Sequence, residues 1–319
     1  MIKQYLGILL SAVYALLIRL LGEWNVIDIN SFSYLIIAPM AMGFIPFYFS
    51  GKGVRTSWVK AIFFPLIAVL VFLLIAVITH LEDLICFIII GAPYIGFSIV
   101  LSVILYSLTK EKKDEPSRKG LSVLALPLVF GMIEKQFPIQ DTDQLISRSV
   151  VIDRPANEVW KHLFAVPDLG SNRPGGWLHA MGIPRPLYAT YDRESNTRLG
   201  YFENGIVLHE SVTESETGHR LTFAINIGKS SLGNSPTLNH ILKNKQVTFR
   251  YIRYELEKQA DGKTLLQLST KYTIHSNLPF YGKFWGKVII KDFEEQLLQA
   301  LKEVLEKGGD ESQTGCIAE

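Results

Sequence analysis

The sequence predicts an α-helical membrane bundle of four or five transmembrane helices followed by an α+β domain, in which a curved antiparallel sheet surrounds a long C-terminal helix. Three observations predict this architecture. Long charge-free apolar runs are confined to residues 1–109, and runs of this length can cross a bilayer as helices. From residue 145 onward, apolar and polar residues alternate as they do in strands. Residues 280–306 return to a helical period with one apolar face.

The composition agrees with a chain made of two different parts. Of the 319 residues, 48% are hydrophobic and only 19% are charged, whereas roughly 25% of the residues of a soluble domain are charged. The length is sufficient for two domains. The net charge is +2, and residues 145–307 contain no dense basic block. The sequence therefore excludes a nucleic-acid partner bound through its phosphates.

Residues 1–109 are predicted to form a transmembrane region of four helices, at about 5–21, 33–49, 58–79 and 84–108. The last two contain uncharged runs long enough to cross roughly 30 Å of hydrocarbon. The second is shorter and contains prolines, which membrane helices tolerate. Near the end of the first, Arg19 is expected to extend its charge to the interface. No small-x-small cleavage site follows that helix, so we expect it to be retained and not removed as a signal peptide.

The loops predict the orientation of these helices. Lys and Arg occur in the loops at 50–60 and 110–119 and are absent from the loops at 22–32 and 79–83. Positively charged loops stay in the cytoplasm. We therefore expect an integral protein of the cytoplasmic (inner) membrane with its N-terminus, its second loop and residues 110–119 on the cytoplasmic side.

Residues 110–144 are predicted to be a basic linker that contains a further apolar segment at 121–133. Its 13 residues are fewer than a spanning helix usually needs, and the alternative is a segment lying in the interface. We favour a fifth span because the segment has no polar face. A fifth span would place the following domain on the outer, periplasmic face; without it, the domain would be cytoplasmic.

The domain at 145–307 is expected to begin with a strand and a short helix. Residues 147–152 alternate and are rich in Val and Ile, which is typical of a strand. Pro155 suits a first helical turn, and Val159 and Leu163 lie on one apolar face of the helix that follows.

Five further strands are predicted, at 198–202, 206–213, 220–227, 246–257 and 263–275. Asn-Gly at 204–205 and Asp-Gly at 261–262 are strong signals for hairpin turns. A long helix at 280–306 and a disordered tail at 308–319 complete the chain. An antiparallel sheet with one apolar face needs a cover, and this helix is the only element large enough to supply it. The space enclosed between the two is where such a fold would hold a ligand.

Several segments resemble the START-like (SRPBCC) superfamily, which has the helix-grip fold. Residues 148–160, with the sequence RSVVIDRPANEVW, resemble its opening signature. Residues 182–186, 198–214 and 221–225 and the helix at 285–293 also fit, so the resemblance covers roughly residues 145–307. It is strongest to bacterial membrane-linked members of the polyketide cyclase/dehydrase-like type. The superfamily includes lipid carriers, hormone receptors, cyclases and chaperone activators, so the resemblance implies a fold and no single reaction.

Candidate residues follow from this architecture. Adjacent strand residues face opposite ways, so only one member of the His209–Glu210 pair can point inward. The candidates for acid–base chemistry are Glu210, Arg198, His179 and Tyr251; the alternative for Glu210 and Arg198 is a structural ion pair. The side chains expected to contact a ligand are Trp160, Trp177, Met181, Phe202, Tyr272, Trp285 and Phe293. HExxH and CxxC motifs are absent, so neither a metal site nor a cofactor is expected.

These observations lead to one functional hypothesis with two alternatives. The hypothesis is a membrane-anchored START-like domain that binds a lipid or another hydrophobic small molecule in an internal cavity. The first alternative is a cyclase- or dehydrase-like enzyme that uses acid–base residues in the cavity. The second is a sensory or interaction module of the cell envelope, which predicts an exposed apolar patch outside the cavity. The oligomeric state is left open.

Overall fold

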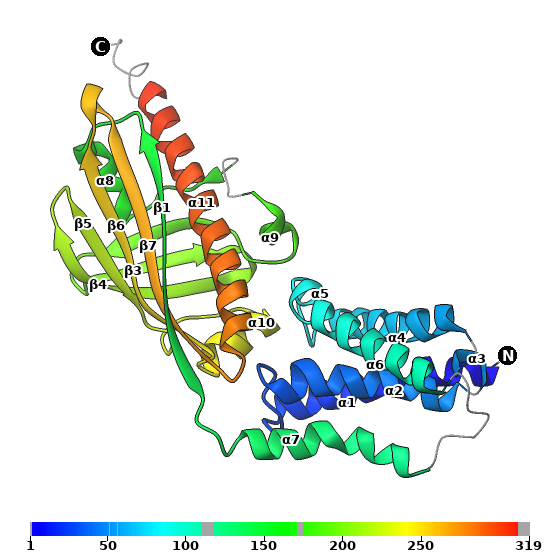
Figure 1. Cartoon of the computed structure of the whole chain (residues 1–319). Coiled ribbons are helices and arrows are strands. Elements are labelled where there is room, and N and C mark those ends of the chain that lie inside the picture. Colours follow the sequence, from blue (N-terminus) through cyan, green and yellow to red (C-terminus); the bar gives the residue numbers. More distant parts are fainter. Residues whose placement is uncertain (1, 51, 56, 110–117, 171–174, 312–319) are drawn as a thin grey trace, which may run out of the picture. The chain divides into compact units, whose positions relative to one another are not determined.

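The computed structural model describes residues 2–50, 52–55, 57–109, 118–170 and 175–311 (Figure 1). The chain divides into two compact units. The first, called the helical unit below, comprises Met1–Gln140 together with Ser276–Leu278. The second, called the sheet unit, comprises Asp141–His275 and Pro279–Glu319. From residue 110 to 117 the expected basic linker lies outside the described residues.

The helical unit contains the four apolar helices that the sequence predicts. Its elements are α1 (Ile2–Glu23), η1 (Ser33–Ile37), α2 (Ala38–Phe49), α3 (Lys52–Arg55), α4 (Trp58–Ile78), α5 (Cys86–Ile89), α6 (Gly91–Thr109), η2 (Arg118–Ala125) and α7 (Leu126–Glu134). Three helices, Tyr5–Glu23, Trp58–Ile78 and Cys86–Thr109, are long and apolar enough to cross a membrane by length and composition. Ser33–Phe49 and Gly120–Glu134 are apolar helices of shorter length.

Arg19 does not extend to an interface as expected. Its side chain is only 1% exposed. It forms an ion pair with the buried Glu82 and another with Glu23, at 2.6 Å, and its Nη2 donates a hydrogen bond to the carbonyl oxygen of Leu81 at 3.0 Å. The prediction was wrong because the loop after α4 supplies a carboxylate within reach of Arg19. An ion pair with further hydrogen bonds offsets the cost of removing the charge from water.

The sheet unit is a seven-stranded antiparallel sheet with a long C-terminal helix, the arrangement of a helix-grip fold (Figure 1). The strand order is β1-β7-β6-β5-β4-β3-β2. The strands are β1 (Gln140–Ile152), β2 (Pro186–Asp192), β3 (Thr197–Phe202), β4 (Ile206–Glu216), β5 (Arg220–Ile225), β6 (Val247–Lys258) and β7 (Thr264–Ser276). The helical elements are α8 (Ala156–Phe164), α9 (Trp177–Ala180), η4 (Glu203–Gly205), α10 (Pro236–Leu238), η5 (Asn239–Lys243), η6 (Ala260–Gly262) and α11 (Pro279–Glu311).

The predicted strands, turns and long helix are confirmed, with three differences. Strand β1 begins at Gln140, seven residues before the predicted start at residue 147 and within the expected linker. Strand β2 was missed because it begins at Pro186, which disfavours a strand assignment; it lies at the edge of the sheet, where proline is tolerated. Helix α11 continues to Glu311, so the first residues of the expected disordered tail are helical. Residues 308 and 309 are glycines, and each disfavours a helix by only about 1 kcal/mol. Residues 312–319 lie outside the described residues.

The two halves of α11 meet different surroundings. Its C-terminal half contributes Leu298, Leu301 and Leu305 to the main hydrophobic core, where they join Val159 and Leu163 of α8 and the adjoining strands. The preceding turns, between residues 289 and 297, face an open space over the middle of the sheet. The packing of α11 therefore leaves a cavity on one side of a well-filled core.

Candidate functional site

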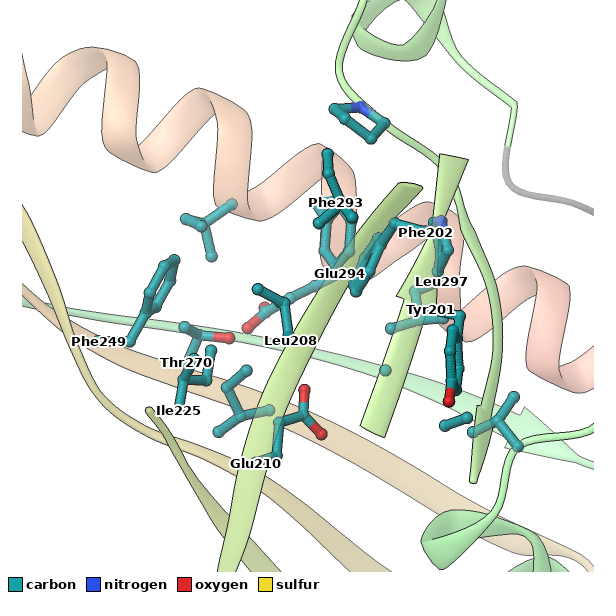
Figure 2. Close-up of a pocket in the computed structure, with 18 of the residues that line it drawn as sticks. Tyr201, Phe202, Leu208, Glu210, Ile225, Phe249, Thr270, Phe293, Glu294 and Leu297 are labelled. Atoms are coloured by element: carbon teal, nitrogen blue, oxygen red, sulfur yellow. The ribbon is translucent and has the colours of Figure 1, made fainter. Parts of the chain in front are cut away.

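A cavity of about 210 Å³ lies between the sheet and α11 (Figure 2). Its wall is mostly aliphatic and aromatic, with contributions from β2 to β7, α11 and the segments that include residues 183–186 and 232–242. Leu208, Ile225, Phe249, Phe293 and Leu297 are among the labelled side chains that point into it (Figure 2). An engineered apolar cavity of about 150 Å³ already binds benzene, so this space is large enough for a somewhat larger apolar ligand.

Arg198 and Glu210 form a buried ion pair in the cavity wall. They are directly paired positions on the neighbouring strands β3 and β4, and they are only 8% and 4% exposed. Arg198 also donates from Nε to the carbonyl oxygen of Phe164 at 3.1 Å, and its guanidinium lies 4.9 Å from the ring centre of Phe223. Burial alone would lower the pKa of Arg198, but the adjacent Glu210 carboxylate outweighs it and the net pKa is raised. Arg198 is therefore a permanent cation in this wall.

Glu294 is the second carboxyl group in the cavity, and it comes from α11. It is 1% exposed, and neither of its carboxyl oxygens has a hydrogen-bond partner of normal geometry among the described residues. Burial raises the pKa of Glu294 to about 7, against the opposing influence of Thr270 and Arg148. A carboxyl that titrates near neutral pH inside an apolar cavity is the kind of group that ligand sites use.

Four of the residues predicted from the sequence line the cavity: Arg198, Glu210, Phe202 and Phe293. The rings of Phe202 and Phe293 stack with their centres 6.3 Å apart, and Figure 2 shows them side by side at one end of the cavity. The wall thus combines one engaged ion pair, one unengaged carboxyl and large apolar side chains. A few polar groups converging in a mostly apolar space is the usual composition of a small-molecule site.

The other two acid–base candidates do not line the cavity. His179 is buried on α9, where its Nδ1 lies 2.8 Å from the carbonyl oxygen of Ile183. Tyr251 packs under the guanidinium of Arg253, 4.7 Å from its ring centre. A bulge in β6 between Phe249 and Tyr251 changes the phase of the strand, so simple alternation from Phe249 assigns Tyr251 to the wrong face.

The remaining predicted ligand contacts also lie outside the cavity lining. Trp160 packs edge-on against Phe164, Trp177 is 43% exposed, and Met181 follows α9 as its C-cap. Tyr272 belongs to a small cluster with Ile146 and Ile274. Trp285 packs edge-on against Tyr281 and Phe284.

Glu294 was missed by the sequence reasoning, although a signal for it exists. Ile290, Glu294, Leu298 and Leu301 recur at helical spacing on the buried side of α11. A carboxylate within an otherwise apolar stripe is unusual and marks either a buried pair or a ligand contact. Within the part of the chain that the structure describes, no group of three His, Cys, Asp or Glu side chains could hold a metal ion.

No family model and no curated protein sequence matches the chain. Among solved structures, the protein XoxI from Bacillus cereus is 11% identical, with 50% of this chain and 94% of that chain covered and a TM-score of 0.32. Truncated norcoclaurine synthase from Thalictrum flavum is 12% identical, with coverages of 53% and 97% and a TM-score of 0.31. A protein of unknown function from Staphylococcus aureus is 11% identical, with coverages of 54% and 98% and a TM-score of 0.35. With TM-scores this low, the fold rests on the strand order and the long helix described above.

Proposed function

We propose that the chain is an integral membrane protein of the cytoplasmic membrane whose START-like sheet unit binds a lipid or another hydrophobic small molecule between the sheet and α11. The cavity is the observation that carries this proposal. Protein interiors are packed as densely as organic crystals, with few voids larger than a water molecule. An apolar pocket of about 210 Å³ beside a filled core departs from this packing and is the kind of space in which proteins bind small molecules.

The membrane helices give this cavity a source of ligands. Three helices have the length and apolar character of membrane spans. A binding unit on the same chain stays within a short distance of the bilayer, where apolar molecules concentrate. The enzymatic alternative has little support from the predicted acid–base residues, because Glu210 is engaged by Arg198 and neither His179 nor Tyr251 lines the cavity. In the described lining, Glu294 is the carboxyl group without an ion pair. Binding is therefore the function that the site supports best.

If the cavity binds an apolar ligand, a larger side chain placed in it should reduce photolabelling of the cavity wall. In the full chain reconstituted in lipid nanodiscs, an alkyl diazirine probe should label the α11 peptide around residues 289–297 on irradiation. Leu208 points into the cavity, so Leu208→Trp should reduce this labelling about tenfold, which corresponds to about 1.4 kcal/mol. Leu145 is exposed on β1, and Leu145→Trp is the matched control. Equal labelling of the two variants, or wild-type protein labelled only in its membrane helices, would contradict the proposal.

We also propose that residues 121–133 cross the membrane as a fifth span. The path of this segment through the helical unit supports it. A Cβ at Gly120 would lie 3.0 Å from the Phe44 ring, near the end of α2. At the other end, the Glu134 carboxylate accepts hydrogen bonds from the backbone N–H and the hydroxyl of Ser33, at 3.0 and 2.8 Å, where the second apolar helix begins. The segment therefore runs antiparallel to that helix over most of its length.

The backbone of this segment explains how so few residues can span. The eight residues of η2 form a 3₁₀-helix and the nine residues of α7 an α-helix. At rises of about 2.0 and 1.5 Å per residue, residues 121–133 are roughly 22 Å long, and the whole stretch from Arg118 to Glu134 reaches roughly 30 Å, the thickness of the hydrocarbon core. The chain would then leave the membrane on the side of the loop at 22–32, which lacks Lys and Arg, and the sheet unit would lie on the outer face.

The proposed orientation predicts the accessibility of engineered cysteines. Lys258 is exposed on the sheet unit and Ser57 lies in the loop at 50–60. In spheroplasts of cells carrying the full chain with Cys316→Ser, a membrane-impermeant maleimide should label the Lys258→Cys variant directly. It should label the Ser57→Cys variant only after the membrane is permeabilised. Labelling of both sites only after permeabilisation would place the sheet unit in the cytoplasm and contradict the fifth span.

A further inference from the structure

We propose that the ligand of this cavity carries an amine, whose ammonium group pairs with Glu294 while its apolar body lies against the aromatic and aliphatic wall. The inference rests on the proposed binding function and adds the chemical class of the ligand. It excludes fatty-acid anions as the preferred occupants.

The donors nearest to Glu294 are the hydroxyl and the backbone N–H of Thr270, and neither reaches its carboxyl oxygens with normal hydrogen-bond geometry. Its two carboxyl oxygens are buried and have no partner of normal geometry, and Figure 2 shows the group directed into the cavity beside Thr270. An unsatisfied buried polar group costs about 1–3 kcal/mol, and a charged one costs more. A ligand that donates hydrogen bonds to this carboxylate recovers that cost, which gives selectivity for donors over purely apolar molecules.

The charge balance of the wall selects a cation among the possible donors. Three charged side chains line the cavity: Arg198, Glu210 and Glu294. Arg198 and Glu210 neutralise each other through their ion pair, so an ionised Glu294 leaves one negative charge in the described lining that has no ion-pair partner, although Arg148 attracts it from β1. An ammonium group cancels that charge, a hydroxyl group leaves it in place, and a carboxylate adds a second one. Burial of an unpaired charge is strongly unfavourable, so the amine is the preferred class.

The charged and titratable groups that face Glu294 from neighbouring elements do not change the preference for a cationic ligand. Arg148 of β1 contributes an attractive charge without a hydrogen bond to Glu294, since its Nη1 donates to the carbonyl oxygen of Ser147 at 3.1 Å. Tyr272 of β7 and Tyr254 of β6 both have a pKa raised to about 12 by burial. These phenols stay neutral between pH 5 and 9. They therefore contribute no change in cavity charge within that range.

Hexylamine, 1-hexanol and hexanoate provide matched probes, because they share one alkyl chain and differ in the polar end. Each is used to compete with the alkyl diazirine probe for labelling of the α11 peptide in the full chain in nanodiscs. At pH 8 hexylamine should compete at a concentration about tenfold or more below that of hexanol, the equivalent of about 1.4 kcal/mol, and hexanoate should compete least. Between pH 6 and pH 8 competition by hexylamine should strengthen by up to about tenfold, as Glu294 loses its proton while the amine remains charged.

Two variants separate the role of Glu294 from general effects. Glu294→Gln should abolish the preference for hexylamine over hexanol and its pH dependence, while labelling by the diazirine probe persists. Glu295→Gln, at the exposed neighbouring position, should keep both. Equal competition by all three probes, or a preference for hexanol or hexanoate, would overturn the amine inference and leave the binding function standing. Absence of any labelling in the cavity would instead refute the proposed binding function.

Discussion

Replacing Arg198 with methionine is expected to lower the free energy of unfolding of the sheet unit by about 3–5 kcal/mol. The substitution keeps much of the side-chain volume but leaves Glu210, which is nearly fully buried, without its cation. It also removes the hydrogen bond to the Phe164 carbonyl oxygen and the stacking on the Phe223 ring. Urea unfolding of the full chain in detergent, followed by tryptophan fluorescence, measures the change as a lower midpoint at an unchanged slope.

Two further variants establish that this loss comes from a buried unpaired charge. The double substitution Arg198→Met with Glu210→Leu removes both charges and should recover most of the stability. Arg220→Met is the matched control: Arg220 pairs with Glu214 and Glu255 but is about one-third exposed, so its loss should cost about 0–1 kcal/mol. A loss below about 1 kcal/mol for Arg198→Met, or a double variant as unstable as the single one, would refute this account of the pair.

Glu294→Gln is expected to stabilise the sheet unit above pH 7 by up to about 3 kcal/mol. The pKa of Glu294 is raised from 4.5 to about 7 in the folded chain, so the folded state resists losing a proton that the unfolded state gives up readily. The wild-type free energy of unfolding should therefore fall by about 1.4 kcal/mol per pH unit as the pH rises from about 4.5 to about 7. Above about pH 7 it should stay level. Glutamine mimics the protonated carboxyl and removes this decline.

The thermal midpoint of the full chain in detergent, recorded between pH 5 and pH 8, tests this expectation. Glu294→Gln should match wild type near pH 5 and exceed it by several degrees at pH 8, because 1 kcal/mol corresponds to about 2–4 °C for a domain of this size. Glu295→Gln should follow wild type throughout. If Glu294→Gln is destabilising at pH 8, the carboxylate has a favourable partner in the apo protein, and the role assigned to it is wrong.

The elements that could be predicted are those whose signal is local. The hydrophobic runs of the apolar helices, the alternation in β6 and β7, and the Asp-Gly turn at residues 261–262 are each contained in one short stretch of sequence. Their positions agree closely with the structure. Strand β2 lacks such a signal because it starts with proline and gains its pairing only at the edge of the sheet.

The site was predicted only in part because its members depend on tertiary contacts. Arg198 and Glu210 could be suggested as a pair, since both lie on predicted strands joined by a hairpin. The orientation of Tyr251 could not be derived, because a single bulge decides it. Glu294 is a carboxylate within an otherwise apolar stripe of α11. Its assignment to a ligand site requires knowledge of the cavity that this stripe faces.

The contrast between the two halves of α11 also bears on how this protein could diversify. The residues that hold the helix to the core, such as Leu298 and Leu301, are one or more turns away from those that face the cavity, such as Ile290 and Glu294. Exchanges at the cavity positions can therefore alter what is bound while the anchoring turns keep the domain folded. Within α11, natural variation in ligand preference would thus be concentrated on about two turns, beside any variation in the strands that form the rest of the wall.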